Sequence, residues 1–186
     1  MLCKYMCLNG TKSVQYQGGI MWYIVQVAAG QEEAVSEKCR QAFPNESYHR
    51  IFVPKYMVLK RYLGQWHEEK KILFPGYFIV DADEGEVIRE VLEHTLRRIA
   101  KPVCVGNDFV PVYPEEQKFL EALLDAQDTV GVSRGDIVNG EYDIKEGLLQ
   151  KWAFCIRRVD RHKRLADIEL LLHGEHKKRS GSTGSH

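Results

Sequence analysis

The sequence carries no excess of charge of either sign. Its 186 residues include 26 lysines and arginines and 26 aspartates and glutamates, so the formal net charge is zero. This balance excludes a protein that is basic over its whole surface, as many nucleic-acid binders are. Hydrophobic residues make up 44%, which is ordinary for a folded globular protein and argues against a disordered chain.

Long apolar runs and paired cysteines are also missing. No run approaches the roughly 20 apolar residues of a membrane span, so the sequence excludes a transmembrane protein. The five cysteines contain no CxxC pair, which disfavours a zinc ribbon or a disulfide framework and favours a reducing cytoplasm. His173 and His176 lack further ligands at suitable spacing, so we expect no metal and no cofactor.

The charges that are present are unevenly distributed. Residues 44–80 hold six basic groups against three acids, and residues 81–130 hold five against twelve. Residues 157–165 then concentrate five basic side chains around a single Asp160. Such a cluster attracts phosphate backbones locally, whatever the total charge. We therefore predict nucleic-acid contact at this cluster, with a solvated surface loop as the alternative.

Residues 21–124 show the patterns of regular secondary structure. Strands are predicted at 22–27 and 77–80, and a hairpin at 50–62 and 66–72 around Leu63-Gly64-Gln65. Amphipathic helices are predicted at 31–43, at 87–95 and from Pro114 onward. This order of elements predicts an α+β fold, an antiparallel sheet with helices packed on it.

The remaining segments have a different character. Residues 1–20 lack periodicity and are expected to be an unstructured extension, with Met21 as a candidate initiator. Residues 125–134 are polar and are predicted to be a linker, and everything after them is strand-like. Some 35 residues would make a small barrel at best.

Several motifs resemble the NusG-type transcription elongation factors. They are Trp22-Tyr23-x-Val25-Gln26, Phe52-Val53-Pro54 and Leu73-Phe74-Pro75-Gly76-Tyr77-Phe78. Residues 140–147 followed by Arg157-Arg158-Val159-Asp160-Arg161-His162-Lys163-Arg164 resemble the KOW domain of that family, and most closely its LoaP subgroup of specialised antiterminators. The resemblance covers about residues 21–174.

The resemblance implies a domain organisation. It comprises an unstructured extension (1–20), an RNA polymerase-binding NGN domain built as an α/β sandwich (21–125), a linker (126–139), a small KOW β-barrel (140–175) and a disordered tail (176–186).

The resemblance also implies binding sites. Phe74, Tyr77 and Ile79 would belong to an apolar depression that binds the clamp helices of RNA polymerase, although Phe74 and Ile79 could instead fill the domain core. Arg97 and Arg98 would lie near the non-template DNA strand or simply end a solvated helix. The basic cluster would bind a nascent RNA hairpin with the side chains of Arg157, Arg158, Arg161, His162, Lys163 and Arg164.

Two features depart from the family pattern. Phe154 stands where the KOW motif has glycine, so that turn is expected to differ. The chain after Gly174 also lacks the pattern of a last barrel strand. We expect a barrel that is incomplete, or one whose edge is covered by the N-terminal extension or a partner.

The sequence thus predicts a non-enzymatic, monomeric antitermination and elongation factor. No catalytic triad and no phosphate-binding glycine loop is evident. One alternative is a general NusG factor whose second domain contacts Rho or a ribosomal protein. Another is a ribosome-associated KOW protein. An RNA-processing enzyme is the least supported interpretation.

Overall fold

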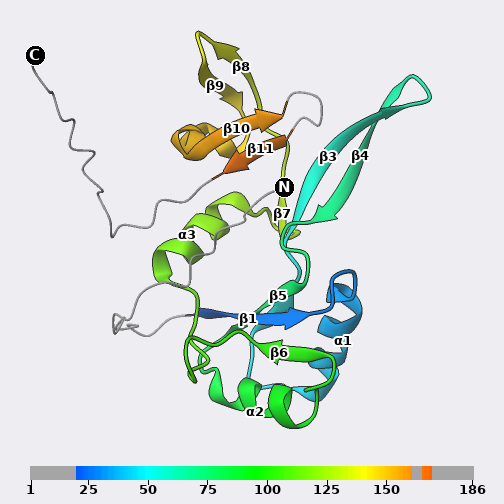
Figure 1. Cartoon of the computed structure of the whole chain (residues 1–186), viewed down its shortest axis with the longest axis vertical. Helices are drawn as coiled ribbons and strands as arrows, with labels where there is room; N and C mark the ends of the chain where they lie inside the picture. The colour runs from blue at the N-terminus through cyan, green and yellow to red at the C-terminus, as the bar shows by residue number, and fades with distance from the viewer. Residues whose placement is uncertain (1–19, 161–164, 169–186) are drawn as a thin grey trace, which may run out of the picture.

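A computed structural model describes residues 20–160 and 165–168, which form helices and small sheets around two apolar clusters (Figure 1). In chain order the elements are β1 (Met21–Val27), α1 (Glu32–Ala42), β2 (Arg50–Phe52), β3 (Lys55–Tyr62), β4 (Gln65–Ile72), β5 (Tyr77–Ala82), α2 (Glu86–His94), β6 (Ala100–Pro102), α3 (Pro114–Leu123), β7 (Thr129–Val130), β8 (Arg134–Val138), β9 (Glu141–Glu146), the 3-10 helix η1 (Leu148–Cys155), β10 (Ile156–Asp160) and β11 (Leu165–Ile168).

A four-stranded antiparallel sheet forms the centre of the first unit, which we define as β1 to β7. Its strand order is β2-β5-β1-β6. Side chains alternate along β1, so Tyr23 and Val25 pack under α1 and α2 with Ile88 and Leu92. Trp22 points to the opposite face, where α3 covers it. Helices on both faces confirm the predicted mixed α and β architecture with an antiparallel sheet.

The predicted hairpin is present, but its first strand is shorter than expected. Residues 50–52 form β2 and pair with β5, whereas β3 begins only at Lys55 and pairs with β4. Val53 and Pro54 separate the two strands, because proline cannot donate a hydrogen bond within a sheet. The β3–β4 hairpin extends away from the rest of the first unit (Figure 1), and we call it the arm.

The second unit, β8 to β11, is not a closed barrel in the residues described. It contains two separate two-stranded antiparallel sheets, β8–β9 and β10–β11. The expectation that everything here is strand is wrong, because Leu148–Cys155 forms a 3-10 helix. Phe154 lies in that helix and is 77% exposed, so no glycine-like turn occurs at this position.

A ring contact joins the two units. Trp152 of η1 meets Phe119 of α3 edge to face, with 4.7 Å between ring centroids. Leu149, Cys155 and Ile168 belong to the same apolar cluster. The segment predicted as a linker also holds β7, which pairs in parallel with the start of β3.

Candidate functional site

The Phe-Pro-Gly-Tyr motif forms a tight turn between β4 and β5. The Tyr77 amide donates a hydrogen bond to the Phe74 carbonyl at 3.0 Å, with Pro75 and Gly76 between them. Gly76 has a φ of +89°, which a side chain would strain. Pro followed by a left-handed Gly is the signature of a type II turn. The turn therefore fixes the direction in which Phe74 and Tyr77 leave the backbone.

The three side chains predicted to contact polymerase differ in exposure. Tyr77 is 36% exposed, Phe74 is partly buried, and Ile79 is only 3% exposed. Alternation along β5 places Tyr77 and Ile79 on one face of the sheet. Ile79 packs with Trp22 and Phe52 in the cluster beneath α3. Tyr77 is thus the most accessible of the three, whereas Ile79 belongs to the core.

Tyr77 begins a row of polar side chains across the sheet. Gln26 lies opposite Tyr77 in the β1–β5 register, and Lys101 lies opposite Gln26 in the β1–β6 register. Directly opposed residues share a face, so the three side chains lie side by side. Gln26 Nε2 donates to the Tyr77 hydroxyl at 3.4 Å. All three are exposed, so the row forms a polar strip on this face of the sheet.

The sequence identified Gln26 only as part of a motif and did not single out Lys101. Strand β6 has three residues, too few for an alternating pattern. The register that joins these side chains depends on long-range strand pairing, which no local signal encodes.

Glu32 stabilises the turn through a buried hydrogen bond. Its side chain is 1% exposed, and its Oε1 accepts a hydrogen bond from the Gly76 amide at 2.6 Å. Burial acts to raise the pKa of this carboxyl. The backbone N–H groups of Gly76, Glu32 and Gly30 outweigh burial, so the net pKa lies below its ordinary value. The only sequence signal for Glu32 is an acidic residue in the first turn of a helix.

Arg97 and Arg98 lie in the turn between α2 and β6. Both are exposed. The turn is closed by the Ile99 and Ala100 amides, which donate to the Leu96 carbonyl at 2.8 and 2.9 Å. Both arginines precede β6, the strand that carries Lys101.

The predicted RNA site is described only in part. Arg161, His162, Lys163 and Arg164 lie outside the described residues, between β10 and β11, which pair as antiparallel strands on either side of them. Arg157 and Arg158 are on β10 and both are exposed.

A β-bulge accounts for two consecutive exposed arginines. The β10–β11 register shifts between Ile156 and Arg158, so Arg157 is the extra residue. A regular strand would send neighbouring side chains to opposite faces, whereas a bulge re-aims one of them. Ile156 remains buried beside the pair. The bulge therefore keeps the strand anchored while it presents both arginines to solvent.

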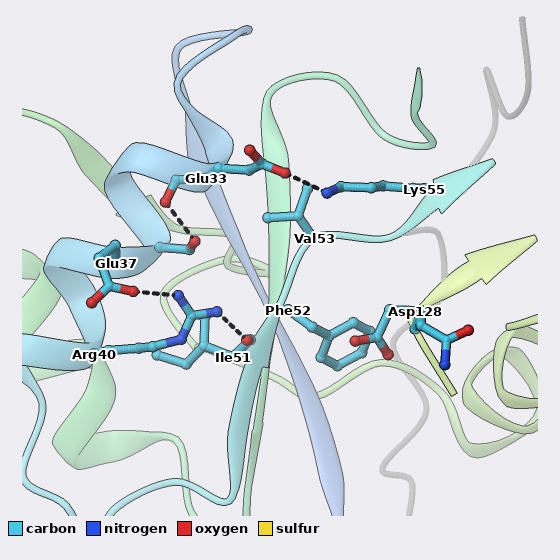
Figure 2. A pocket seen from close by; sticks show the side chains of 10 residues that line it. Glu33, Glu37, Arg40, Ile51, Phe52, Val53, Lys55 and Asp128 are labelled. Atoms are coloured by element: carbon cyan, nitrogen blue, oxygen red, sulfur yellow. Dashed lines mark hydrogen bonds and ion pairs between the residues drawn. The ribbon is translucent and has the colours of Figure 1, made fainter. Parts of the chain in front are cut away.

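A hollow of about 370 Å³ lies between α1 and the β2–β3 segment, away from all predicted site residues (Figure 2). Its charged groups are paired, either with one another or, for Asp128, with Arg50 outside the lining. Arg40 binds Glu37 and the Ile51 carbonyl at 2.8 and 2.6 Å, and Lys55 binds Glu33. The described lining therefore offers no unpaired charged side chain to a ligand.

Metal clusters and membrane-spanning helices are absent from the part of the chain that the structure describes. Residues 20–160 and 165–168 contain no group of three or more His, Cys, Asp or Glu side chains that could hold a metal ion. None of the helices within these ranges has the length and apolar character needed to cross a membrane.

Comparison with known proteins identifies the first unit. The family model NusG, described as transcription termination factor nusG, matches residues 21–121, more than half of the chain. The match begins at β1, contains the Phe74–Tyr77 turn and ends within α3. A search of curated proteins finds no match. Members of this family are non-enzymatic transcription factors whose domain contacts RNA polymerase. The chain therefore belongs to the NusG family.

Proposed function

We propose that the protein is an antitermination and elongation factor that binds the clamp helices of RNA polymerase through the face around Tyr77. The observation that carries this proposal is the exposed Tyr77 ring, held by a rigid turn inside the segment that matches the family. Aromatic rings supply a large contact area at a small entropic cost. Gln26 and Lys101 would form the polar rim of the contact.

Replacing Tyr77 by alanine tests the polymerase contact. Tyr77→Ala removes a ring that is more than a third exposed, so the fold should survive while co-purification with polymerase falls by ten-fold or more, as expected for a central interface residue worth about 2 kcal/mol. The matched control is Val87→Ala, which removes an apolar side chain of similar exposure (40%) from α2, on the opposite side of the sheet. Retained binding by a folded Tyr77→Ala protein would reject this face as the site.

We propose further that the basic cluster of the second unit binds a hairpin in the nascent RNA. The bulge at Arg157 supports this, because it turns two adjacent guanidinium groups outward beside the strand connection that carries the other four basic residues. Arginine can contact phosphates in bidentate fashion, and RNA hairpins are recognised largely by shape and backbone. Linking this site to the polymerase site would raise the overall avidity.

The salt dependence of RNA binding tests the cluster. Combined Arg157→Ala, Arg161→Ala and Arg164→Ala substitutions should weaken hairpin binding and flatten its dependence on salt by about 0.7–0.9 of a slope unit for each phosphate that the variant no longer neutralises. Lys38→Ala on α1 and Lys118→Ala on α3, two exposed lysines outside every proposed binding surface, provide a charge control. An unchanged slope in the triple variant would mean that the cluster does not contact phosphates.

One observation favours a second candidate, a general NusG-type factor whose second unit contacts Rho or a ribosomal protein. Val138, Leu148 and Phe154 expose apolar surface on the second unit, at 53%, 38% and 77%. Exposed apolar patches are typical of protein contacts. Phe154→Ala should abolish binding to such a partner and leave hairpin binding unchanged.

A further inference from the structure

The arm has no role in either proposed contact, yet it is the most prominent projection of the first unit (Figure 1). Only its base is anchored. Val58 is buried, and Lys55 and Tyr56 pair with β7. From Arg61 to Trp66 every residue is exposed. The outer half of the arm is therefore accessible to another molecule.

The turn at the tip contains a residue that is poorly suited to its backbone. Tyr62 pairs with Gln65, which leaves a two-residue loop of Leu63 and Gly64 with φ values of +51° and +76°. Such turns favour Asn-Gly, because a bulky side chain is disfavoured at positive φ. The Leu63 side chain is also 92% exposed. Leucine here neither suits the turn nor packs within the chain, which indicates an external contact.

Aromatic rings lie on both faces of the arm directly below the tip. Tyr62 stacks on His67 with 3.6 Å between centroids and an angle of 13°. Arg61 and Trp66 are opposed in the register and so share the other face, where the guanidinium lies 5.8 Å from the indole centroid. Tyr62 and Trp66 are each 48% exposed. Each face thus offers a ring that is held in place and open to solvent.

Cationic side chains accompany these rings. Arg61 lies beside Trp66, and Lys60 lies opposite His67 on the face of Tyr62, where it also pairs with Glu69 at 2.5 Å. Lys70 and Lys71 are exposed farther down β4. Flat aromatic surface next to positive charge is the chemistry that recognises unpaired bases and their phosphates. An apolar pocket on a protein would match Leu63 but not the flanking cations.

We propose that the tip of the arm binds single-stranded nucleic acid. Bases stack on Tyr62 and Trp66, Leu63 inserts between neighbouring bases as an apolar wedge, and Lys60 and Arg61 contact phosphates. Stacking and phosphate contact are common to DNA and RNA. The site is separate from the polar row around Tyr77 and from the cluster at Arg157, so it stands independently of the function proposed above.

Titration of the full chain with oligo(dT) and oligo(rU) tests this site without polymerase. The starting protein carries Arg157→Ala, Arg161→Ala and Arg164→Ala, so that the second unit does not contribute. Affinity is measured by anisotropy of the labelled oligonucleotide, and stacking by quenching of tryptophan fluorescence. Trp66→Ala should weaken binding about 5- to 100-fold and remove the quenching, because each stacked base contributes that much.

The Leu63→Asn substitution distinguishes a loss of binding from a loss of folding. Asparagine suits the turn, so the melting temperature should stay the same or rise while the affinity for the oligonucleotides falls. Val87→Ala on α2, an equally small change at an exposed aliphatic residue, should leave the affinity unchanged. Weaker binding to only one oligonucleotide supports the proposal and identifies the preferred sugar. Unchanged affinity of folded Trp66→Ala and Leu63→Asn proteins for both oligonucleotides would overturn it.

Discussion

At the scale of single residues, the geometry of the face around Tyr77 depends on a carboxylate that is itself buried. Glu32 is buried at the start of α1 and accepts the Gly76 amide across the β4–β5 turn. Hydrogen bonds to an ionised group contribute about 1.5–3 kcal/mol each. Glu32 therefore acts as a positioning residue, since it fixes Gly76 and through it the direction of Tyr77.

The lowered pKa of Glu32 predicts a pH effect with a definite sign. The ionised carboxylate stabilises the folded state. This stabilisation is fully present when the pH is above 4.5, the ordinary pKa of a glutamate, and it is lost as the pH falls through the lower pKa that Glu32 has in the folded protein. Glu32→Gln should cost about 1–2 kcal/mol at pH 7 and progressively less at lower pH. Urea unfolding of both proteins from pH 7 to pH 3 measures the difference.

Glu115→Gln serves as the control, because Glu115 is likewise an acidic residue in the first turn of a helix but its side chain is exposed. If the difference in unfolding free energy between Glu32→Gln and the parent protein stayed constant from pH 7 to pH 3, the role assigned to the charge would be contradicted.

At the scale of elements, the helix between the two small sheets of the second unit determines how that unit meets α3. Phe119 is buried in the first unit, whereas Trp152 reaches it from η1. An edge-to-face aromatic pair contributes about 0.5–1.5 kcal/mol beyond its buried area. This contact is therefore large enough to affect how often the two units separate.

Trp152→Ala should loosen the second unit without unfolding the first. Protease cleavage between β7 and β8 is expected to become about 2- to 10-fold faster, since separation exposes that connection. Limited proteolysis measures the rate, and the urea midpoint of the first unit should remain unchanged. Val138→Ala is the control, because this exposed side chain on β8 lies outside the apolar cluster that joins the two units. An unchanged cleavage rate in Trp152→Ala would mean that the ring pair does not hold the units together.

Local patterns predicted most elements of the first unit, and the differences have physical causes. Helix α1 and strand β1 follow directly from apolar spacing. The split of the predicted first hairpin strand into β2 and β3 depends on pairing with two different partners. Helix η1 was not predicted because a 3-10 segment with Trp152 in a non-helical conformation has no regular apolar period.

The candidate sites show the same division between local and long-range information. The turn that presents Tyr77 is encoded by Pro75 and Gly76, so the motif was sufficient to find it. Lys101 and Glu32 join the site only through sheet register and tertiary packing. The bulge at Arg157 is likewise a property of strand pairing rather than of the residues alone.

At the scale of the whole molecule, the zero net charge conceals separate local fields. The acidic excess belongs to residues 81–130, while positive charge gathers on the arm and around β10. Exposed charges farther apart than about 8–10 Å are screened from one another at physiological salt. Each basic surface can therefore attract phosphate groups despite the neutral total.

Pairing of β7 with β3 has a consequence for folding during synthesis. Lys55 lies opposite Thr129 in a parallel pair, and the Lys55 amide donates to the Asp128 carbonyl at 2.9 Å. Closing this contact requires the chain between the two strands to be complete. A ribosome must therefore expose residues up to 130 before the base of the arm can be fixed. Until then β3 carries an unpaired edge, and the nascent first unit is most vulnerable to wrong strand pairing during that interval.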